Sequence, residues 1–181
     1  MKKSTIILLT FLVIIFACKK ESKEEIEARD DKLTLQRTNY TGNELRIDGY
    51  YCQKIDGMYY SCYFFYNNGT LLYGGGGLTE IEMQNLETTF SNGSFYNTAK
   101  DIKYFWGLYN INGNSIAFER WYPSSGGSLP ASIRSGIILN DSTFQITQSI
   151  RSNGSESTQK NEIYYYKKFS PKPDSTNQYI P

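Results

Sequence analysis

The chain contains no histidine, and this absence removes most of the common catalytic and metal-binding chemistry. Serine and cysteine triads, His-ligated zinc and many general bases that work near neutral pH depend on an imidazole. Of the three cysteines, Cys18, Cys52 and Cys62, the last two are too few to hold zinc without histidine. No pair of carboxylates stands out as the acid and base of glycoside hydrolysis. We therefore expect no enzyme activity, no metal ion and no cofactor.

Cys18 follows a segment that is first basic and then apolar. Lys2 and Lys3 precede the stretch 6–16, which only Thr10 interrupts. A membrane-spanning helix needs roughly 20 apolar residues, so this shorter stretch fits the apolar region of a secretory signal peptide. Residues 15–18, Ile-Phe-Ala-Cys, resemble the lipobox of bacterial lipoproteins. The resemblance implies a signal peptide over residues 1–17 and a lipidated Cys18. The alternative is an ordinary cleaved signal with an incidental cysteine.

Residues 18–44 read as a charged tether that follows the lipidated cysteine. Lys19 is not the aspartate that retains lipoproteins in the inner membrane of enteric bacteria. Lys23-Glu24-Glu25 resembles the signal that sends lipoproteins of the Bacteroidetes group to the cell surface. These likenesses imply attachment to the outer membrane, on its periplasmic face or at the cell surface. Residues 21–32 favour a short helix. We expect this helix to be exposed, because it has no apolar stripe that would pack against the barrel.

Cys52 and Cys62 lie on two strands that Asp56-Gly57 joins as a hairpin. A two-residue loop would place Cys52 opposite Ser61. A three-residue loop or a one-residue bulge would place Cys52 opposite Cys62 and make the pair a disulfide candidate. The alternative is two free, buried thiols that act as small apolar residues.

An aromatic hairpin over residues 103–122 carries the candidate ligand-binding side chains. A turn at Asn112-Gly113 would pair Tyr109 with Ile116, Gly107 with Phe118 and Phe105 with Arg120, all on one interior face. The candidates for ligand contact are Phe105, Tyr109, Phe118 and Arg120. The guanidinium of Arg120 would pair with a ligand carboxylate. The alternative is that Arg120 lies at a strand end and reaches water.

The opposite face of this hairpin is unusually aromatic for a surface in contact with solvent. It carries Tyr104, Trp106 and Trp121, and we expect Glu119 beside them to be exposed. Tyr and Trp are common anchors of protein interfaces, so this face could meet a partner in the cell envelope. Alternatively, the helix expected over residues 80–90 covers it.

The remaining elements predict a mainly β fold with eight antiparallel strands and one short helix after the third strand. The capping box from Thr79 to Glu82 begins that helix. A hairpin around Asn140-Asp141 would place four apolar side chains on one face: Ile137, Leu139, Phe144 and Ile146. Five Asn-x-Ser/Thr triplets are interpreted mainly as turn chemistry, and they begin at Asn39, Asn68, Asn92, Asn140 and Asn153. Short connections between sequential strands favour a closed up-and-down barrel over residues 45–169, followed by a Pro-rich tail over residues 170–181.

The barrel segment resembles the lipocalin-like lipoproteins of the Bacteroidetes group. The likeness rests on four segments: residues 48–51, 64–70, 106–118 and 165–169. It implies a calycin-type barrel that encloses side chains or one small ligand. Without residues 1–17 the chain has 17 basic and 18 acidic side chains, which gives no electrostatic case for nucleic acid. We expect a non-catalytic, lipid-anchored barrel that binds a small apolar or amphipathic ligand. The alternative is an envelope interaction protein that works through its aromatic outer surface.

Overall fold

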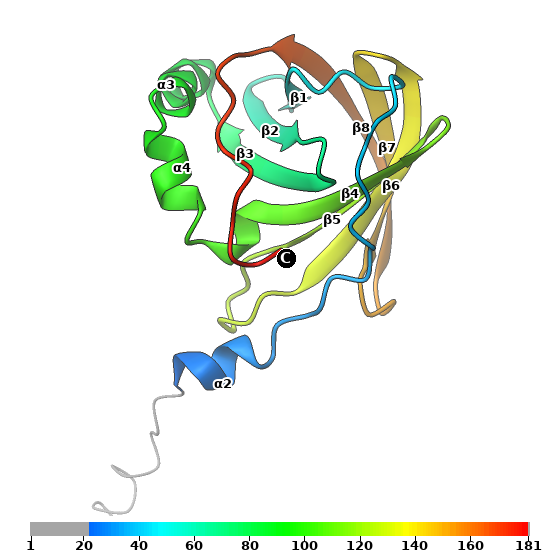
Figure 1. Ribbon diagram of the computed structural model, residues 1–181. Coiled ribbons are helices and arrows are strands. Elements are labelled where there is room, and N and C mark those ends of the chain that lie inside the picture. The colour runs from blue at the N-terminus through cyan, green and yellow to red at the C-terminus, as the bar shows by residue number, and fades with distance from the viewer. Residues whose placement is uncertain (1–21, 181) are drawn as a thin grey trace, which may run out of the picture.

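The computed structural model describes residues 22–180, in which eight antiparallel strands close into one barrel (Figure 1). Each strand pairs with the next along the chain, and β1 also pairs with β8, so the expected up-and-down barrel is confirmed. The strands are β1 (Gly49–Ile55), β2 (Tyr59–Phe65), β3 (Thr70–Leu78), β4 (Trp106–Asn112), β5 (Ser115–Trp121), β6 (Ala131–Asn140), β7 (Thr143–Arg151) and β8 (Ser157–Lys168). Closure pairs every strand on both sides and leaves no sheet edge.

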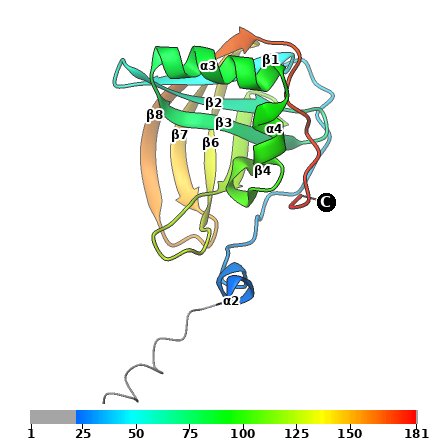
Figure 2. The same ribbon diagram turned by 90° about the vertical axis from the view of Figure 1, so that its left-hand side faces the viewer.

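The connection between β3 and β4 is helical. α3 (Glu80–Ser91) begins at the Thr79–Glu82 capping box, as predicted. The same connection also forms α4 (Ser94–Ala99) and the short 3-10 helix η1 (Lys103–Phe105), which the sequence did not predict. Figure 2 shows α3 and α4 on the outside of the barrel. A fourth short helix, α2 (Lys23–Glu27), precedes the barrel and buries no residue, in agreement with the expected exposed helix.

Aromatic side chains fill the middle of the barrel. Phe118 and Phe144 are fully buried there. The Tyr63 and Phe118 rings lie 5.0 Å apart, and the Phe144 and Tyr164 rings stack at 4.8 Å between centroids. A second apolar cluster lies outside the barrel wall, where Trp106, Phe64 and Phe90 pack with the helical connection. The sheet is therefore buried on both faces along β2 to β4.

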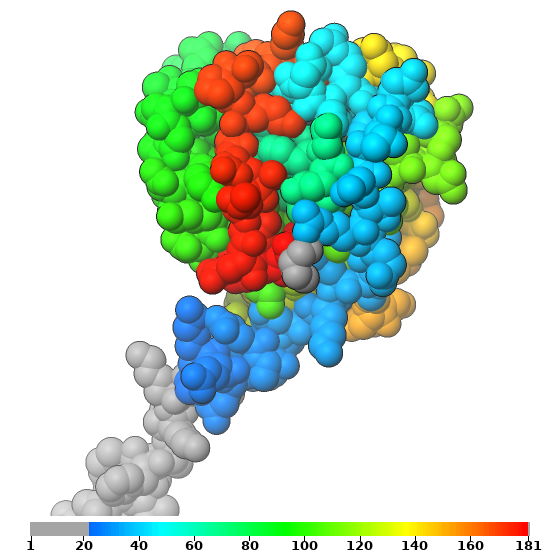
Figure 3. All heavy atoms as spheres, viewed as in Figure 1, coloured from blue at the N-terminus to red at the C-terminus, as the bar shows by residue number. Residues whose placement is uncertain are grey.

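The segments before and after the barrel both pack on it. Tyr40 donates a hydrogen bond to the Leu45 carbonyl at 3.1 Å, and both side chains join the interior cluster. The tail runs back along the barrel, where Lys172 Nζ donates to the Phe65 carbonyl at 2.7 Å. Figure 3 shows this tail between the helical segment and the N-terminal arm, by which we mean residues 30–48. The expected tether of residues 18–44 thus includes a long stretch of the barrel's own covering.

The β4–β5 hairpin has a register two residues away from the predicted one. Tyr109 pairs with Phe118, and Gly107 pairs with Arg120. The turn residues are Gly113 and Asn114 rather than Asn112 and Gly113. A shift of two keeps every side chain on its predicted face, because side chains alternate with a period of two. Arg120 nevertheless loses its predicted partner, because Phe105 lies in η1 before β4 begins.

The β6–β7 hairpin departs from the prediction by one residue near its turn. Ile138, not Ile137, pairs with Phe144, and the turn residues are Asp141 and Ser142. A slip of one residue exchanges the two faces of a strand. The predicted grouping of Ile137 and Leu139 with Phe144 and Ile146 is therefore wrong: Ile137 and Leu139 are exposed, whereas Ile138 joins Phe144 and Ile146 in the interior cluster.

In the β1–β2 hairpin, the three-residue alternative for the loop is the one that the structure contains. Ile55 pairs with Tyr59 around residues 56–58, and Cys52 pairs directly with Cys62. Asp56 and Gly57 both have positive φ, at 49° and 72°. Both cysteines are free thiols in the structure, so the disulfide stays a prediction.

The predicted signal peptide, residues 1–17, and Cys18 lie outside the described residues. Within residues 22–180, no helix is long and apolar enough to cross a membrane.

Candidate functional site

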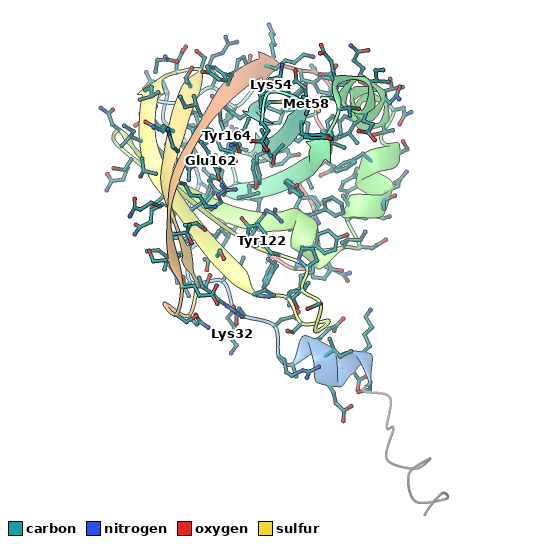
Figure 4. The ribbon with its side chains drawn as sticks, turned by 180° about the vertical axis from the view of Figure 1, so that it is seen from behind. Lys32, Lys54, Met58, Tyr122, Glu162 and Tyr164 are labelled. Atoms are coloured by element: carbon teal, nitrogen blue, oxygen red, sulfur yellow. The ribbon has the colours of Figure 1, made fainter. Side chains whose placement is uncertain are left out.

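The two ends of the barrel are built differently. At the plugged end, where β1 begins and β8 ends, Tyr40 and Leu45 lie across the interior and are almost completely buried. At the open end lie the β1–β2, β3–β4, β5–β6 and β7–β8 connections. Figure 4 looks toward this open end, with Lys54 and Met58 on the β1–β2 hairpin and Tyr122 after β5.

Polar side chains line the interior at the open end. Phe118 belongs to the interior cluster and pairs with Arg134, which in turn pairs with Ser149. Residues paired across strands point to the same side of a sheet, so this row lines the interior. The same reasoning places further polar and partly buried residues on this side: Gln53, Ser132, Arg134, Ser149, Lys160 and Glu162. Solvent therefore reaches into the barrel at this end.

Arg120 lies at the floor of this polar region and is only 5% exposed. Its Nε donates to the Tyr63 hydroxyl at 3.3 Å, and its Nη1 donates to the Tyr104 and Trp121 carbonyls at 3.1 and 2.9 Å. The guanidinium carbon lies 3.9 Å from the ring centroid of Tyr73 and 3.8 Å from that of Tyr122. Cation–π attraction to these two rings partly replaces the lost hydration of the charge.

No carboxylate of residues 22–180 lies within ion-pair distance of Arg120. Its Nη2 likewise donates to no acceptor in this part of the chain. Removing a charge from water is costly unless the charge is paired. Arg120 is buried without the carboxylate counter-ion that usually offsets this cost.

Arg134 is the second interior cation, and its environment is only partly satisfied. Its Nη2 bonds to Glu162 Oε2, which also accepts from the Tyr164 hydroxyl at 3.2 Å. Lys160 Nζ lies 3.9 Å from the other oxygen of Glu162. Arg134 Nε is buried and has no hydrogen-bond partner in the described structure. One interior carboxylate, Glu162, thus faces two interior cations, Arg134 and Lys160.

The side-chain pKa values of Tyr63 and Tyr122 reflect the positive charge of the two arginines. Burial alone would raise the pKa of Tyr63, but the charges of Arg120 and Arg134 outweigh burial and lower it. At Tyr122, burial dominates and raises the pKa to about 12. The hydroxyl of Tyr63 therefore belongs to the electropositive floor of the open end, between the two guanidinium groups.

The four predicted ligand-contact residues lie in three different places: the open end of the barrel, its filled middle and its outer surface. Arg120 does point into the barrel; it is buried, so the alternative that it reaches water is wrong. Tyr109 and Phe118 are also interior, but they belong to the filled middle of the barrel. The interior position predicted for Phe105 is wrong, because it lies in η1 and packs on the outer cluster, with its ring 5.5 Å from that of Phe95.

Sequence reasoning missed Arg134 and Glu162 as interior residues. The predicted β6–β7 register groups Ile137 and Leu139 with Phe144 and Ile146, and it offers no reason to look for an interior residue at Arg134. Glu162 could have been found from the alternation Lys160-x-Glu162-x-Tyr164 in β8.

The expected exposed aromatic surface does not exist in the described structure. Trp106 is fully buried and donates from Nε1 to the Ala99 carbonyl at 2.8 Å. Trp121 is 5% exposed and donates to the Asp31 carbonyl at 2.7 Å. The expectation that Glu119 is exposed is also wrong, because it is fully buried. The N-terminal arm and α4 cover this face, together with the C-terminal tail.

Comparisons with models of protein families, with curated proteins and with solved structures give no match. The fold defines a small closed barrel of eight antiparallel strands, which is compatible with a lipocalin-like fold. Among the described residues, no group of three or more histidine, cysteine, aspartate or glutamate side chains could hold a metal ion.

Proposed function

We propose that this protein is a non-catalytic, lipid-anchored barrel that binds a small amphipathic acid at its open end. The observation that carries the proposal is Arg120, a buried cation with two flanking tyrosine rings and no carboxylate partner in the described structure. An anionic ligand would supply the counter-charge that the fold leaves out.

Two unused donors favour an anion over a neutral ligand. Arg120 Nη2 and the buried Arg134 Nε are both without an acceptor in residues 22–180. Guanidinium groups bind carboxylates through short, charge-assisted hydrogen bonds. Each such bond contributes about 1.5–3 kcal/mol, which corresponds to roughly a 10- to 150-fold change in affinity.

The filled middle of the barrel limits how deep a ligand can reach. Below Arg120, the fully buried rings of Tyr63, Phe118 and Phe144 occupy the interior. The acid group would therefore lie deepest and the apolar part would lie toward the rim. There, Ile55 and Tyr59 face each other across β1 and β2, and Tyr59 is 39% exposed. This arrangement suits a short aliphatic or aromatic acid better than a long chain.

The membrane anchor is a second part of the proposal and rests on the N-terminal sequence. A lipidated Cys18 would hold the barrel at the outer membrane through its acyl chains, each adding about 0.8 kcal/mol per buried CH₂. Growth with labelled palmitate should label the wild-type protein and not the Cys18→Ser variant. Equal labelling of both would refute lipidation at this residue.

The first experiment on binding is native mass spectrometry of the full chain, extracted from its own envelope membranes in mild detergent. A reproducible additional mass that is lost on denaturation would support a bound small molecule and define its class. A bare polypeptide that also binds no added acid would favour the alternative, an envelope interaction protein without an internal ligand.

Binding is then tested with pairs of ligands that differ only in charge, such as octanoic acid and octanol, or an aromatic acid and its alcohol. We expect each acid to bind more tightly than its alcohol, and Arg120→Met to remove the difference. Lys54→Met is the matched control, since it removes an exposed cation from the outer side of the same end. Ser132→Phe keeps both arginines and fills the open end, so it should weaken binding of acids and alcohols alike. Equal binding of acid and alcohol to the wild type would refute the role of Arg120.

A further inference from the structure

Cys52 and Cys62 form a pair on the outside of the barrel, away from the open-end site. They lie directly opposite each other on β1 and β2, and both side chains join the outer apolar cluster beneath α3. Residues directly opposite in an antiparallel pair have Cα atoms about 4.5–5.5 Å apart. A disulfide joins Cα atoms about 4.4–6.8 Å apart, so the bond requires little backbone movement.

The two thiols differ in accessibility. Cys62 is completely buried. Cys52 is partly exposed and lines a pocket of about 330 Å³, which Met83 and Glu87 of α3 also line. A small molecule in this pocket would therefore meet the sulfur of Cys52 first.

The position of α3 explains the pocket. Glu87 accepts a hydrogen bond from the Tyr50 hydroxyl and lies over β1 at that point. Four residues earlier in α3 is Met83, about 6 Å away along the helix axis. Two residues later in β1 is Cys52, about 6.7 Å along the strand on the same face. The helix therefore walls the pocket above Cys52 without filling it.

We propose that Cys52 and Cys62 are an exchangeable dithiol–disulfide site, in which Cys52 reacts with external disulfides through the pocket and Cys62 resolves the product. Small-molecule and protein disulfides with an accessible sulfur are the class of reactant. This site is separate from the ligand site in the barrel, and neither depends on the other.

The chemistry balances without a cofactor. The Cys52 thiolate attacks one sulfur of the external disulfide, whose S–S bond breaks and releases the first thiolate, which takes up a proton from water. The Cys62 sulfur then attacks the Cys52 sulfur, and the second external thiolate leaves with the Cys62 proton. Two electrons pass from the two protein thiols to the external disulfide, which becomes two thiols.

The surroundings assign the two roles. The hydrogen bond with Cys52, followed by burial, raises the pKa of the Cys62 thiol well above its usual value. Cys62 thus keeps its proton until the second step, whereas the accessible Cys52 meets the external disulfide first. Glu87 and Lys167 also line the pocket and form an ion pair, which reduces the negative charge there.

The test uses the full-length chain, reduced under native conditions and then mixed with oxidised glutathione, with each cysteine followed by peptide mass spectrometry. The wild type should form the Cys52–Cys62 disulfide with only a transient adduct. Cys62→Ser should retain a stable glutathione adduct on Cys52. Cys52→Ser is the matched control, and its buried Cys62 should react at least about 100-fold more slowly, the factor that an opening cost of roughly 2.7 kcal/mol imposes.

Three results would overturn the proposal. One is a lasting glutathione adduct on Cys52 in the wild type, because Cys62 would then not resolve it. Another is equal reactivity of Cys62 and Cys52 in the single variants. The third is a Cys52–Cys62 bond that dithiothreitol reduces only in denaturant, because the bond would then be a permanent structural crosslink.

Discussion

We expect Glu119→Ala to release the N-terminal arm from the barrel and to destabilise the protein strongly. Glu119 Oε2 accepts hydrogen bonds from the backbone N–H groups of Thr34 and Leu35, both at 2.7 Å. Its Oε1 accepts from the Thr34 hydroxyl at 3.2 Å and from the Ser152 hydroxyl. The carboxylate is fully buried, and its four donors are neutral groups that join two distant segments to β5. Removal of the side chain leaves the two backbone donors without an acceptor.

The magnitude follows from the number of charge-assisted bonds. A hydrogen bond to a charged group contributes about 1.5–3 kcal/mol, so the two backbone bonds set a scale of about 3–6 kcal/mol. Detachment of the arm would return its N–H donors to water and so reduce the destabilisation. We therefore expect Glu119→Ala to lower the free energy of unfolding in urea by about 3 kcal/mol. For a domain of this size, that corresponds to a melting temperature roughly 6–12 °C lower. Amide exchange at Thr34 and Leu35 should accelerate together.

The matched control is Glu156→Ala, because the side chain of Glu156 is 75% exposed and its ion pair with Arg151 spans 3.8 Å. An exposed pair of this kind contributes less than about 1 kcal/mol. If Glu119→Ala costs no more than the control, and the Thr34 and Leu35 amides remain protected, then the arm is held by other contacts. The role assigned to Glu119 would then be wrong.

Three further outcomes follow from burial and charge. Acrylamide should quench the fluorescence of the folded protein weakly, because Trp106 and Trp121 are at most 5% exposed; quenching as strong as in the unfolded chain would contradict the covered face. Phe144→Ala should lower the free energy of unfolding in urea by about 3–5 kcal/mol, because it empties the centre of the aromatic interior; a loss under 1 kcal/mol would mean the interior is loosely packed. The hydrogen bond from Tyr166 lowers the pKa of Asp48 to about 2, so this contact stabilises the fold above pH 3.8 and is lost as the pH falls toward 2. In an NMR titration, Tyr166→Phe should raise the pKa of Asp48, and an unchanged value would refute this cause.

The strand count and the barrel were predictable because they depend on local signals. Asparagine side chains mark several of the turns, and four of the five Asn-x-Ser/Thr triplets use the same local hydrogen bonds. In each, the asparagine Oδ1 accepts from the backbone N–H and the hydroxyl of the residue two positions later. This is turn chemistry within three residues, so it requires no knowledge of the tertiary structure.

The hairpin registers were harder, because the turn signals allow more than one position for the loop. In Asn112-Gly113-Asn114, the glycine takes the first central position with φ of 54°, which is typical of a type II′ turn. At the next hairpin, Asn140 bonds to Ser142 and therefore precedes the turn instead of occupying its centre. The first error leaves every side chain on its predicted face, whereas the second groups Ile137 and Leu139 with the wrong face.

The candidate site could not be predicted as a unit, because its residues come from distant strands. Tyr63 of β2 and Arg120 of β5 are 57 residues apart and meet only when the barrel closes. The hairpin pattern gave Arg120 an interior direction, but the rings around it follow from the packing of the whole barrel. For the same reason, the sequence did not indicate that Tyr109 and Phe118 would lie in a filled core.

The composition of the interior argues that the open end serves more than stability. A barrel that only had to be filled could continue its aromatic packing up to the rim, as it does between Phe118 and Phe144. Instead, polar side chains line the interior above Arg120, and two arginine donors remain without acceptors in the described structure: Arg120 Nη2 and the buried Arg134 Nε. Replacing buried ionic groups by apolar residues of similar size is often neutral or stabilising, so stability alone gives no reason to keep them. Local violations of packing rules are expected at functional sites, and here they converge on one electropositive region.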